Sequence, residues 1–132
     1  MAYTLIGKDF IPPDVHGKVT GKAKYAEDFK VEGMLYARLL TSPIPHARIV
    51  RLDVSKALQM EGVVAVLTAD DVPEMPNLGN PILTNEPAYV GDPILAVAAI
   101  DEQTAEDAIE AIDFIFEPLP FVVDPLKSLQ PG

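Results

Sequence analysis

The sequence contains no cysteine, and only two of its 132 residues are histidine. The missing thiols exclude disulfides, thiolate nucleophiles and cysteine-bound zinc or iron–sulfur clusters within this chain. His16 and His46 lie far apart in the sequence and belong to no pattern with metal-ligand spacing. We therefore expect no metal site here, and we predict that His46 forms a hydrogen bond within a loop.

Positive charge is scarce, and long apolar runs are missing. Ten Lys and Arg residues against 20 Asp and Glu residues give a net charge of −10, and such a surface repels phosphate backbones. The longest strictly apolar run, residues 94–100, is far shorter than the roughly 20 residues that span a bilayer. Residues 1–5 lack the basic start of a secretory signal. We expect no nucleic-acid binding, no membrane insertion and a cytoplasmic location.

The usual motifs of catalysis are also missing. Gly17 and Gly21 fit neither a phosphate-binding loop nor a dinucleotide fingerprint, and no Gly-x-Ser-x-Gly elbow occurs. Glu102, Glu106 and Glu110 recur every four residues, but they lie opposite the apolar face of a predicted helix and are interpreted as a solvated stripe. The residues alone therefore do not indicate an enzyme, and we assign no catalytic, cofactor-binding or metal-binding residue.

Residues 1–33 are interpreted as an extended N-terminal arm. They show weak periodicity and contain many Gly and Pro residues, which favour turns. A flexible linker would be poor in large apolar side chains, yet this segment has seven of them, namely Tyr3, Leu5, Ile6, Phe10, Ile11, Tyr25 and Phe29. We expect the arm to lie against an apolar surface, either on a partner or on its own domain.

Residues 34–132 predict one α+β domain, in which short strands carry helices on one face. Alternating or short apolar runs favour strands at residues 34–40, 47–54, 63–67, 94–100 and 112–116. Ser55 and Asp101 are predicted to cap helices, and residues 124–129 favour a last short helix. Thr68 and Asp71 have the spacing of a capped turn.

Residues 74–87 predict a long loop of fixed shape. This stretch contains three prolines together with Asn77, Gly79, Asn80 and Asn85. Loops of such length are uncommon inside a compact domain, and they are often functional.

Six short motifs, in a fixed order, resemble one enzyme family. They are DVHGKVTGKAKYAED at residues 14–28, GMLYARLLTSP at 33–43, PHARI at 45–49, GVVAVLTADDVP at 62–73, YVGDP at 89–93 and EPLP at 117–120. Together they resemble the start of the molybdenum-binding subunit in the xanthine dehydrogenase/aldehyde oxidase family. The resemblance covers about residues 6–129, which is nearly the whole chain.

The resemblance implies an α/β hammerhead fold and a part in a molybdenum hydroxylase. Enzymes of this family hydroxylate a carbon centre with oxygen from water, and their electrons leave through iron–sulfur clusters and usually FAD. The residues that hold the molybdenum–molybdopterin cofactor and the glutamate base follow the hammerhead. This chain is therefore expected to be non-catalytic and to bind no cofactor itself. Its expected partners are a molybdopterin-binding large subunit and the iron–sulfur and FAD subunits of the same complex.

The same resemblance suggests which residues face the substrate and the partner. In the family the long loop lies near the substrate funnel, so Pro76, Asn77 and Leu78 are predicted to line part of the access path. The arm and the loops at residues 42–46 and 89–93 are predicted to contact the cofactor-binding subunit. The candidate contact residues are Tyr25, Ser42, His46, Tyr89 and Gly91.

Two alternatives stay open at this stage. The chain is either a separately encoded subunit or a domain cut from a longer protein, and a start at Met1 followed by a full arm favours the former. A free-standing hammerhead module for binding or scaffolding, with no redox role, is the alternative function. The sequence names no substrate, and hydroxylation, hydration and alcohol oxidation would all fit it.

Overall fold

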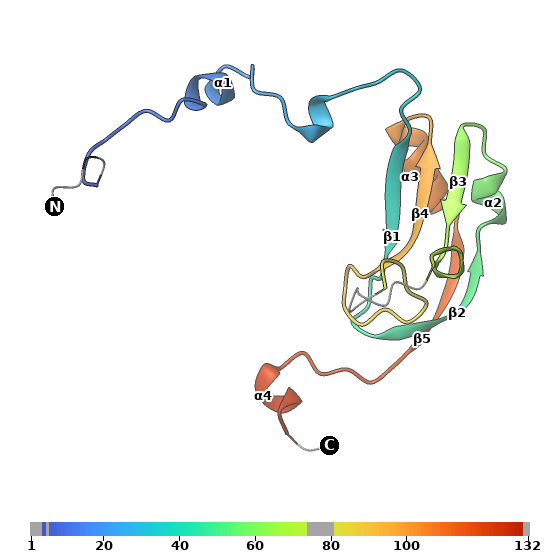
Figure 1. The fold of residues 1–132 in the computed structure, drawn as a ribbon. Coiled ribbons are helices and arrows are strands. Elements are labelled where there is room, and N and C mark those ends of the chain that lie inside the picture. Colours follow the sequence, from blue (N-terminus) through green and yellow to red (C-terminus); the bar gives the residue numbers. More distant parts are fainter. Residues whose placement is uncertain (1–3, 5, 74–80, 131–132) are drawn as a thin grey trace. The chain divides into compact units, whose positions relative to one another are not determined.

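Two separate units make up the chain in the computed structural model, which describes residues 4, 6–73 and 81–130. The first unit, Met1–Met34, contains the short helix α1 (Val15–Val19) and the 3-10 turn η1 (Ala26–Asp28) (Figure 1). Neither element contains a buried residue. The second unit, Leu35–Gly132, contains the five strands that the described residues form. The expected domain division after residue 33 stays a prediction.

Two antiparallel sheets form the second unit. The first has the order β1 (Tyr36–Thr41), β4 (Pro93–Ala99), β3 (Val63–Leu67), and the second pairs β2 (Ala47–Asp53) with β5 (Asp113–Pro118). Helix α3 (Glu102–Glu110) packs on β1 and β4, and α2 (Ser55–Leu58) packs on β3 and α3. The prediction of short strands carrying helices is confirmed.

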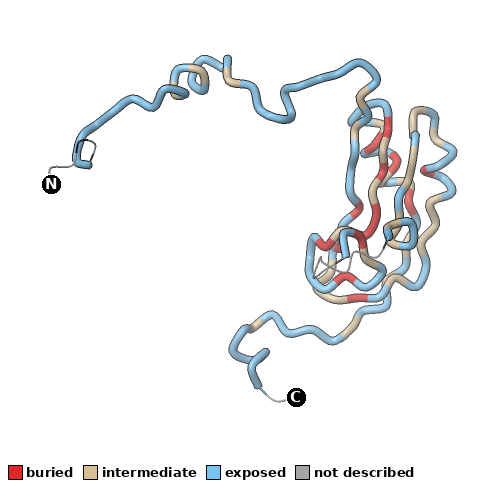
Figure 2. The backbone as a smooth tube through the Cα atoms, in the orientation of Figure 1, coloured by how far each residue is buried: buried red, intermediate tan, exposed pale blue. Residues whose placement is uncertain are grey.

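The core is built around β4, the central strand of the first sheet (Figure 2). Its run of apolar residues has side chains on both faces, and Ile94, Leu95 and Val97 are at most 1% exposed. A strand covered on both faces needs such a continuous apolar run. Helix α3 contributes Ala108, and Phe114 from β5 closes the cluster from the second sheet.

Local capping sets where the helices begin, and one predicted cap was wrong. Asp101 caps α3 as expected, since its carboxylate accepts a hydrogen bond from Thr104 N–H at 2.7 Å. Ser55, predicted to be a cap, is instead the first residue of α2. The carboxylate of Asp53, at the end of β2, accepts the Ser55 N–H at 3.0 Å and takes over that role.

The turn that follows β3 is also capped as predicted. The Asp71 carboxylate accepts both the N–H and the hydroxyl of Thr68 at 2.8 Å, which closes the 3-10 turn η2 (Ala69–Asp71). A last short helix, α4 (Pro125–Ser128), begins where the Asp124 carboxylate accepts Leu126 N–H. Among the residues described, no helix is long and apolar enough to cross a membrane.

Candidate functional site: a loop cluster beside both sheets

Two loops predicted from separate parts of the sequence lie together in the fold. Residues 42–46 connect β1 to β2, and residues 84–93 lead into β4. We call these two loops the loop cluster. Two backbone bonds join them: Ser42 N–H donates to the carbonyl of Asp92 at 2.9 Å, and Gly91 N–H donates to the carbonyl of Ser42 at 2.8 Å. Gly91 has a φ of 97°, which favours glycine at this turn.

The side chain of Ser42 forms hydrogen bonds within the loop cluster. It is 2% exposed, its hydroxyl donates to the Ile44 carbonyl at 2.8 Å, and the same oxygen faces the Ile44 N–H at 3.3 Å. The hydroxyl therefore shapes a loop in which Pro43 and Pro45 offer no N–H of their own. Of the predicted contact residues in the cluster, Tyr89 and Gly91 are exposed, and His46 is half-buried.

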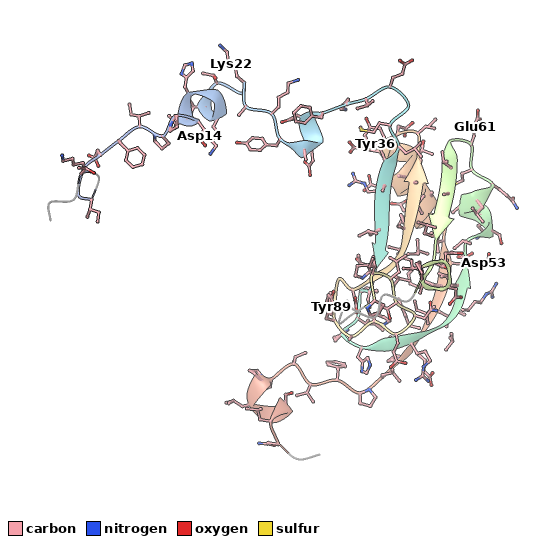
Figure 3. All side chains as sticks on the ribbon, viewed as in Figure 1. Asp14, Lys22, Tyr36, Asp53, Glu61 and Tyr89 are labelled. Atoms are coloured by element: carbon pink, nitrogen blue, oxygen red, sulfur yellow. The ribbon has the colours of Figure 1, made fainter. Side chains whose placement is uncertain are left out.

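Asp92 holds the second loop in place from within. Its side chain is buried, and its carboxylate accepts the Ala88 N–H at 2.9 Å. Tyr89, at the surface of the same turn (Figure 3), lies near that carboxylate. The negative charge of Asp92 is the main cause that raises the pKa of the Tyr89 hydroxyl above its ordinary value. A tyrosine hydroxyl is neutral at ordinary pH, so Tyr89 offers a hydrogen-bond donor on the exposed surface.

We expect Asp92→Ala to lower the free energy of unfolding by about 1–3 kcal/mol, because the partly buried Ala88 N–H would lose its acceptor. The control is Asp107→Ala, which removes an exposed carboxylate whose one hydrogen bond to a described residue comes from the Gln103 side chain. Its effect should stay within about 0.5 kcal/mol. Urea unfolding of both variants measures the difference. Equal effects would mean that Asp92 does not hold the turn.

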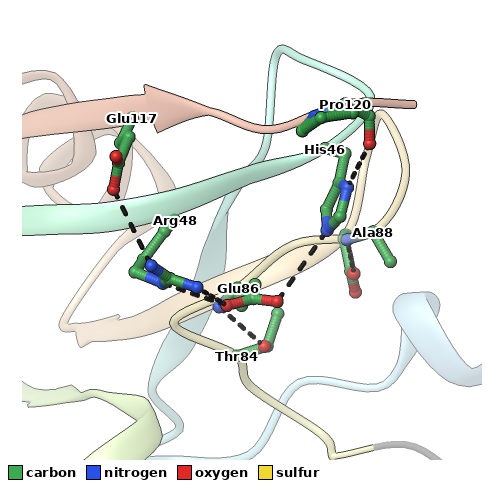
Figure 4. A network of polar contacts seen from close by, with 8 residues as sticks. His46, Arg48, Thr84, Glu86, Ala88, Glu117 and Pro120 are labelled. Carbon is green, nitrogen blue, oxygen red and sulfur yellow. Dashed lines mark hydrogen bonds and ion pairs between the residues drawn. The ribbon is translucent and has the colours of Figure 1, made fainter.

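A polar network ties the first loop to the end of β5 (Figure 4). Arg48 donates to one carboxylate oxygen of Glu86 through Nε at 3.1 Å and through a terminal nitrogen at 3.0 Å, and its other terminal nitrogen lies 3.8 Å from Glu117. His46 lies between the other Glu86 oxygen, 3.9 Å from Nε2, and the carbonyl of Pro120, 2.8 Å from Nδ1. A carbonyl only accepts, so Nδ1 of His46 donates to Pro120.

This network orients the loops more than it stabilises the fold. The side chains of Arg48, Glu86 and Glu117 are about half exposed, and exposed ion pairs contribute little to stability. The expectation that His46 forms a hydrogen bond at its loop is confirmed. Its partner is the segment that leaves β5, which the sequence did not indicate.

Residues 85–87 extend the second sheet on the free side of β2. Ala47 N–H donates to the carbonyl of Pro87 at 3.1 Å, and Ile49 N–H donates to the carbonyl of Asn85 at 2.9 Å. This pairing brings Glu86 beside Arg48. Sequence reasoning missed Arg48, Glu86, Asp92 and Glu117 because their partners lie on distant segments of the sequence. No local pattern pairs a cation in the strand at residues 47–54 with a glutamate in the loop at residues 74–87.

The other candidate residues lie outside the loop cluster. Pro76, Asn77 and Leu78 are outside the described residues. Tyr25 belongs to the first unit, where it is exposed and its N–H donates to the Asp28 carboxylate at 2.9 Å. The assignment of these residues to a substrate path or to a partner stays a prediction.

The described residues of this chain do not fit the molybdenum–molybdopterin cofactor that the sequence motifs imply. In residues 4, 6–73 and 81–130 no three His, Cys, Asp or Glu side chains are grouped so that they could hold a metal ion. Every buried polar side-chain atom in that part of the chain already has a partner. We therefore assign no step of a reaction to these residues.

Comparison with known proteins decides the family. The family model of the aldehyde oxidase and xanthine dehydrogenase a/b hammerhead domain matches residues 20–120. This chain belongs to that family. The resemblance predicted from six short motifs is confirmed, and so is the hammerhead fold.

The relatives and the solved structures point to the same family as the family model. The chain is 44% identical over 128 residues to a probable xanthine dehydrogenase subunit of Bacillus subtilis, covering 92% of this chain and 17% of that protein. It is 37% identical to the nicotinate dehydrogenase large molybdopterin subunit of Eubacterium barkeri, covering 97% and 32%. A Cu,Mo-CO dehydrogenase structure matches with a TM-score of 0.83 and 35% identity, covering 95% of this chain and 17% of that one. The hammerhead thus spans less than a third of each of these proteins.

Proposed function

We propose that this hammerhead is the non-catalytic portion of a molybdenum hydroxylase-type oxidoreductase, as a separate subunit or as a domain. It completes the molybdopterin-binding subunit of the enzyme. The observation that carries this proposal is coverage: the match takes in 92–97% of this chain but only 17–32% of two large relatives. The donor groups of the described residues, which do not fit a metal or pterin, support the same assignment.

The assembled enzyme supplies the redox chemistry in this proposal. Relatives include a large molybdopterin subunit and a molybdenum-binding subunit, and a solved neighbour is a Cu,Mo enzyme. We infer molybdenum–molybdopterin in the partner polypeptide, with iron–sulfur clusters and FAD in further subunits, in a cytoplasmic complex. The molybdopterin-binding polypeptide is the direct partner of this chain.

The loop cluster is the partner-facing surface in this proposal. It presents the exposed Tyr89 and Val90 on a turn that Asp92 and Ser42 hold from within. A turn fixed in this way loses little conformational freedom on binding, which favours affinity. Pro76, Asn77 and Leu78, which precede the second loop of the cluster in the sequence, complete the proposal as part of the substrate access path.

The isolated chain is expected to bind no stoichiometric molybdenum, iron or flavin and to show no dehydrogenase activity. The reason is the lack of thiols throughout the sequence and of a grouped donor set in the described residues. Elemental analysis and visible absorption of the purified chain measure this. Stoichiometric metal on the refolded chain would overturn the assignment of a non-catalytic role.

Purification from the native host tests the function itself. A tag on the gene product should bring down a polypeptide with molybdenum and pterin, and the purified material should reduce an artificial electron acceptor with electrons from an added oxidisable substrate. The alternative, a free-standing scaffold module, predicts that no molybdenum polypeptide is bound. Recovery of the tagged product without molybdenum, under conditions in which other molybdenum enzymes of the host stay loaded, would support that alternative.

A further inference from the structure

Three consecutive residues between β5 and α4 are exposed, and their backbone N–H groups have no partner among the described residues. Phe121, Val122 and Val123 are 54%, 59% and 78% exposed. Their N–H groups form no hydrogen bond with any described residue of the chain. Phenylalanine and valine favour strands. Residues 121–123 are thus a short strand-forming stretch whose backbone N–H groups face solvent.

Neighbouring residues hold this segment extended. Pro118, Pro120 and Pro125 each fix their own φ and keep the preceding residue out of the helical region. On one side, Leu119 N–H donates to the His46 carbonyl at 3.0 Å, and the His46 ring donates to the Pro120 carbonyl at 2.8 Å. On the other side, Asp124 has extended backbone angles of φ −86° and ψ 116°. Residues 121–123 therefore lie between two neighbours whose backbone is held extended, Pro120 and Asp124.

The side chains of the segment suit a strand that is covered on both faces. Phenylalanine and valine favour strands, and side chains alternate between the two faces of a strand. Phe121 and Val123 would therefore cover one face and Val122 the other, and all three are apolar. Residues 118–123 contain no charged side chain, although the chain has a net charge of −10. Apolar residues on both faces are typical of a strand enclosed between two layers.

We propose that Phe121–Val123 adds as a short strand to an open sheet edge of the molybdopterin-binding polypeptide, between apolar side chains on both faces. Strand addition of this kind draws its affinity from main-chain hydrogen bonds and its specificity from alternate side chains. A second copy of the chain is the weaker choice, because two bodies of charge −10 repel each other. The inference rests on the proposed function, since it takes its partner from there.

Hydrogen exchange of the full chain, alone and in the purified complex, tests the pairing directly. The amides of residues 121–123 should exchange rapidly in the free chain, because no described residue offers them an acceptor. In the complex, at least one of them should slow by tenfold or more. Unchanged exchange of all three amides in a complex that has formed would overturn the inference and leave the proposed function intact.

Two proline variants separate backbone pairing from apolar contact. Neighbouring N–H groups of a strand point to opposite sides, so only one of Val122 and Val123 can donate to the partner edge. Val122→Pro and Val123→Pro should therefore differ: one should weaken the complex at least tenfold, and the other, whose N–H faces away, much less. Val122→Thr and Val123→Thr keep the N–H and the branched shape and serve as matched controls.

The other possible results of these binding measurements also test the inference. If neither proline variant weakens the complex, the strand pairing is wrong. If the threonine variants weaken it as much as the proline variants, apolar burial holds the segment and the pairing is again wrong. A chain that forms dimers through this segment would overturn the choice of partner, and a chain that binds no molybdopterin polypeptide would overturn the proposed function as well. Because the segment lies outside both sheets, all four variants should melt at the temperature of the unchanged chain.

Discussion

Replacing Leu95 by alanine is expected to lower the free energy of unfolding by about 2–5 kcal/mol, the usual range for a buried leucine. Leu95 is fully buried in β4, where it pairs with Leu40 of β1 and belongs to the main core cluster. Helix α3 and the second sheet enclose this cluster, so little can move to fill the cavity. Small domains have only about 5–15 kcal/mol of net stability, and this change removes a large part of it.

Leu39→Ala is the matched control for this prediction. Leu39 lies next to Leu40 in β1 but is 51% exposed, so the same substitution should cost less than about 1 kcal/mol. Urea unfolding of both variants, with the slope of the transition unchanged, measures the difference. A larger effect at Leu39 than at Leu95 would mean that β4 is not the centre of the core.

The strands and the main helix were predictable because local pattern decides them. The apolar run of β4 predicted a buried strand, and its place between β1 and β3 explains why both of its faces are apolar. Asp101 predicted the start of α3. An aspartate carboxylate can accept the N–H of the residue three positions later, here Thr104, and this contact does not depend on what the helix packs against. Such features depend on neighbours in the sequence.

The candidate site was predictable only in part, because it depends on pairing between distant segments. The loops at residues 42–46 and 89–93 were chosen through a family resemblance. No local rule states that Ser42 N–H donates to the Asp92 carbonyl, which belongs to a distant part of the sequence. The pairing of residues 85–87 with β2 was missed for the same reason, since a stretch with prolines at residues 81 and 87 has no strand pattern.

The error at Ser55 shows how pairing between distant strands can shift the start of a helix. Serine before an apolar residue is a good cap, but the cap position belongs to Val54 because β2 continues to Asp53. The paired register of β2 with β5 fixes where that strand ends, with Asp53 opposite Asp113. The start of α2 is therefore set by strand pairing and by the Asp53 carboxylate, neither of which residues 55–60 reveal by themselves.

Deleting residues 1–30 is expected to weaken the complex with the molybdopterin-binding polypeptide at least 100-fold, while the isolated second unit keeps its stability. The elements of the arm, α1 and η1, contain no buried residue, so the arm cannot cover its own apolar side chains. Full burial of one such side chain is worth about 1.5–3 kcal/mol. A loss of about 100-fold corresponds to about 2.7 kcal/mol, which is less than the burial of two of these side chains supplies.

A matched pair of point variants isolates the apolar contribution of the arm. Phe10→Ser with Ile11→Ser removes two large exposed apolar groups, and Lys8→Ser with Asp9→Ser changes two neighbours without altering the net charge or the length. The first pair should weaken binding at least tenfold, and the second should leave it nearly unchanged. Titration of the tagged partner with each variant, followed by calorimetry or by surface-based binding, measures the ratio.

The competing arrangement, in which the arm folds back on its own domain, gives a different pair of results. Truncation would then lower the melting temperature of the isolated chain, and Phe10→Ser with Ile11→Ser would do the same. If the truncated chain melts as before and still assembles as tightly as the full chain, the arm has no role at either surface. The partner-docking prediction holds only if the melting temperature stays constant while affinity falls, because apolar groups that are left in water without the partner contribute to binding and not to the fold.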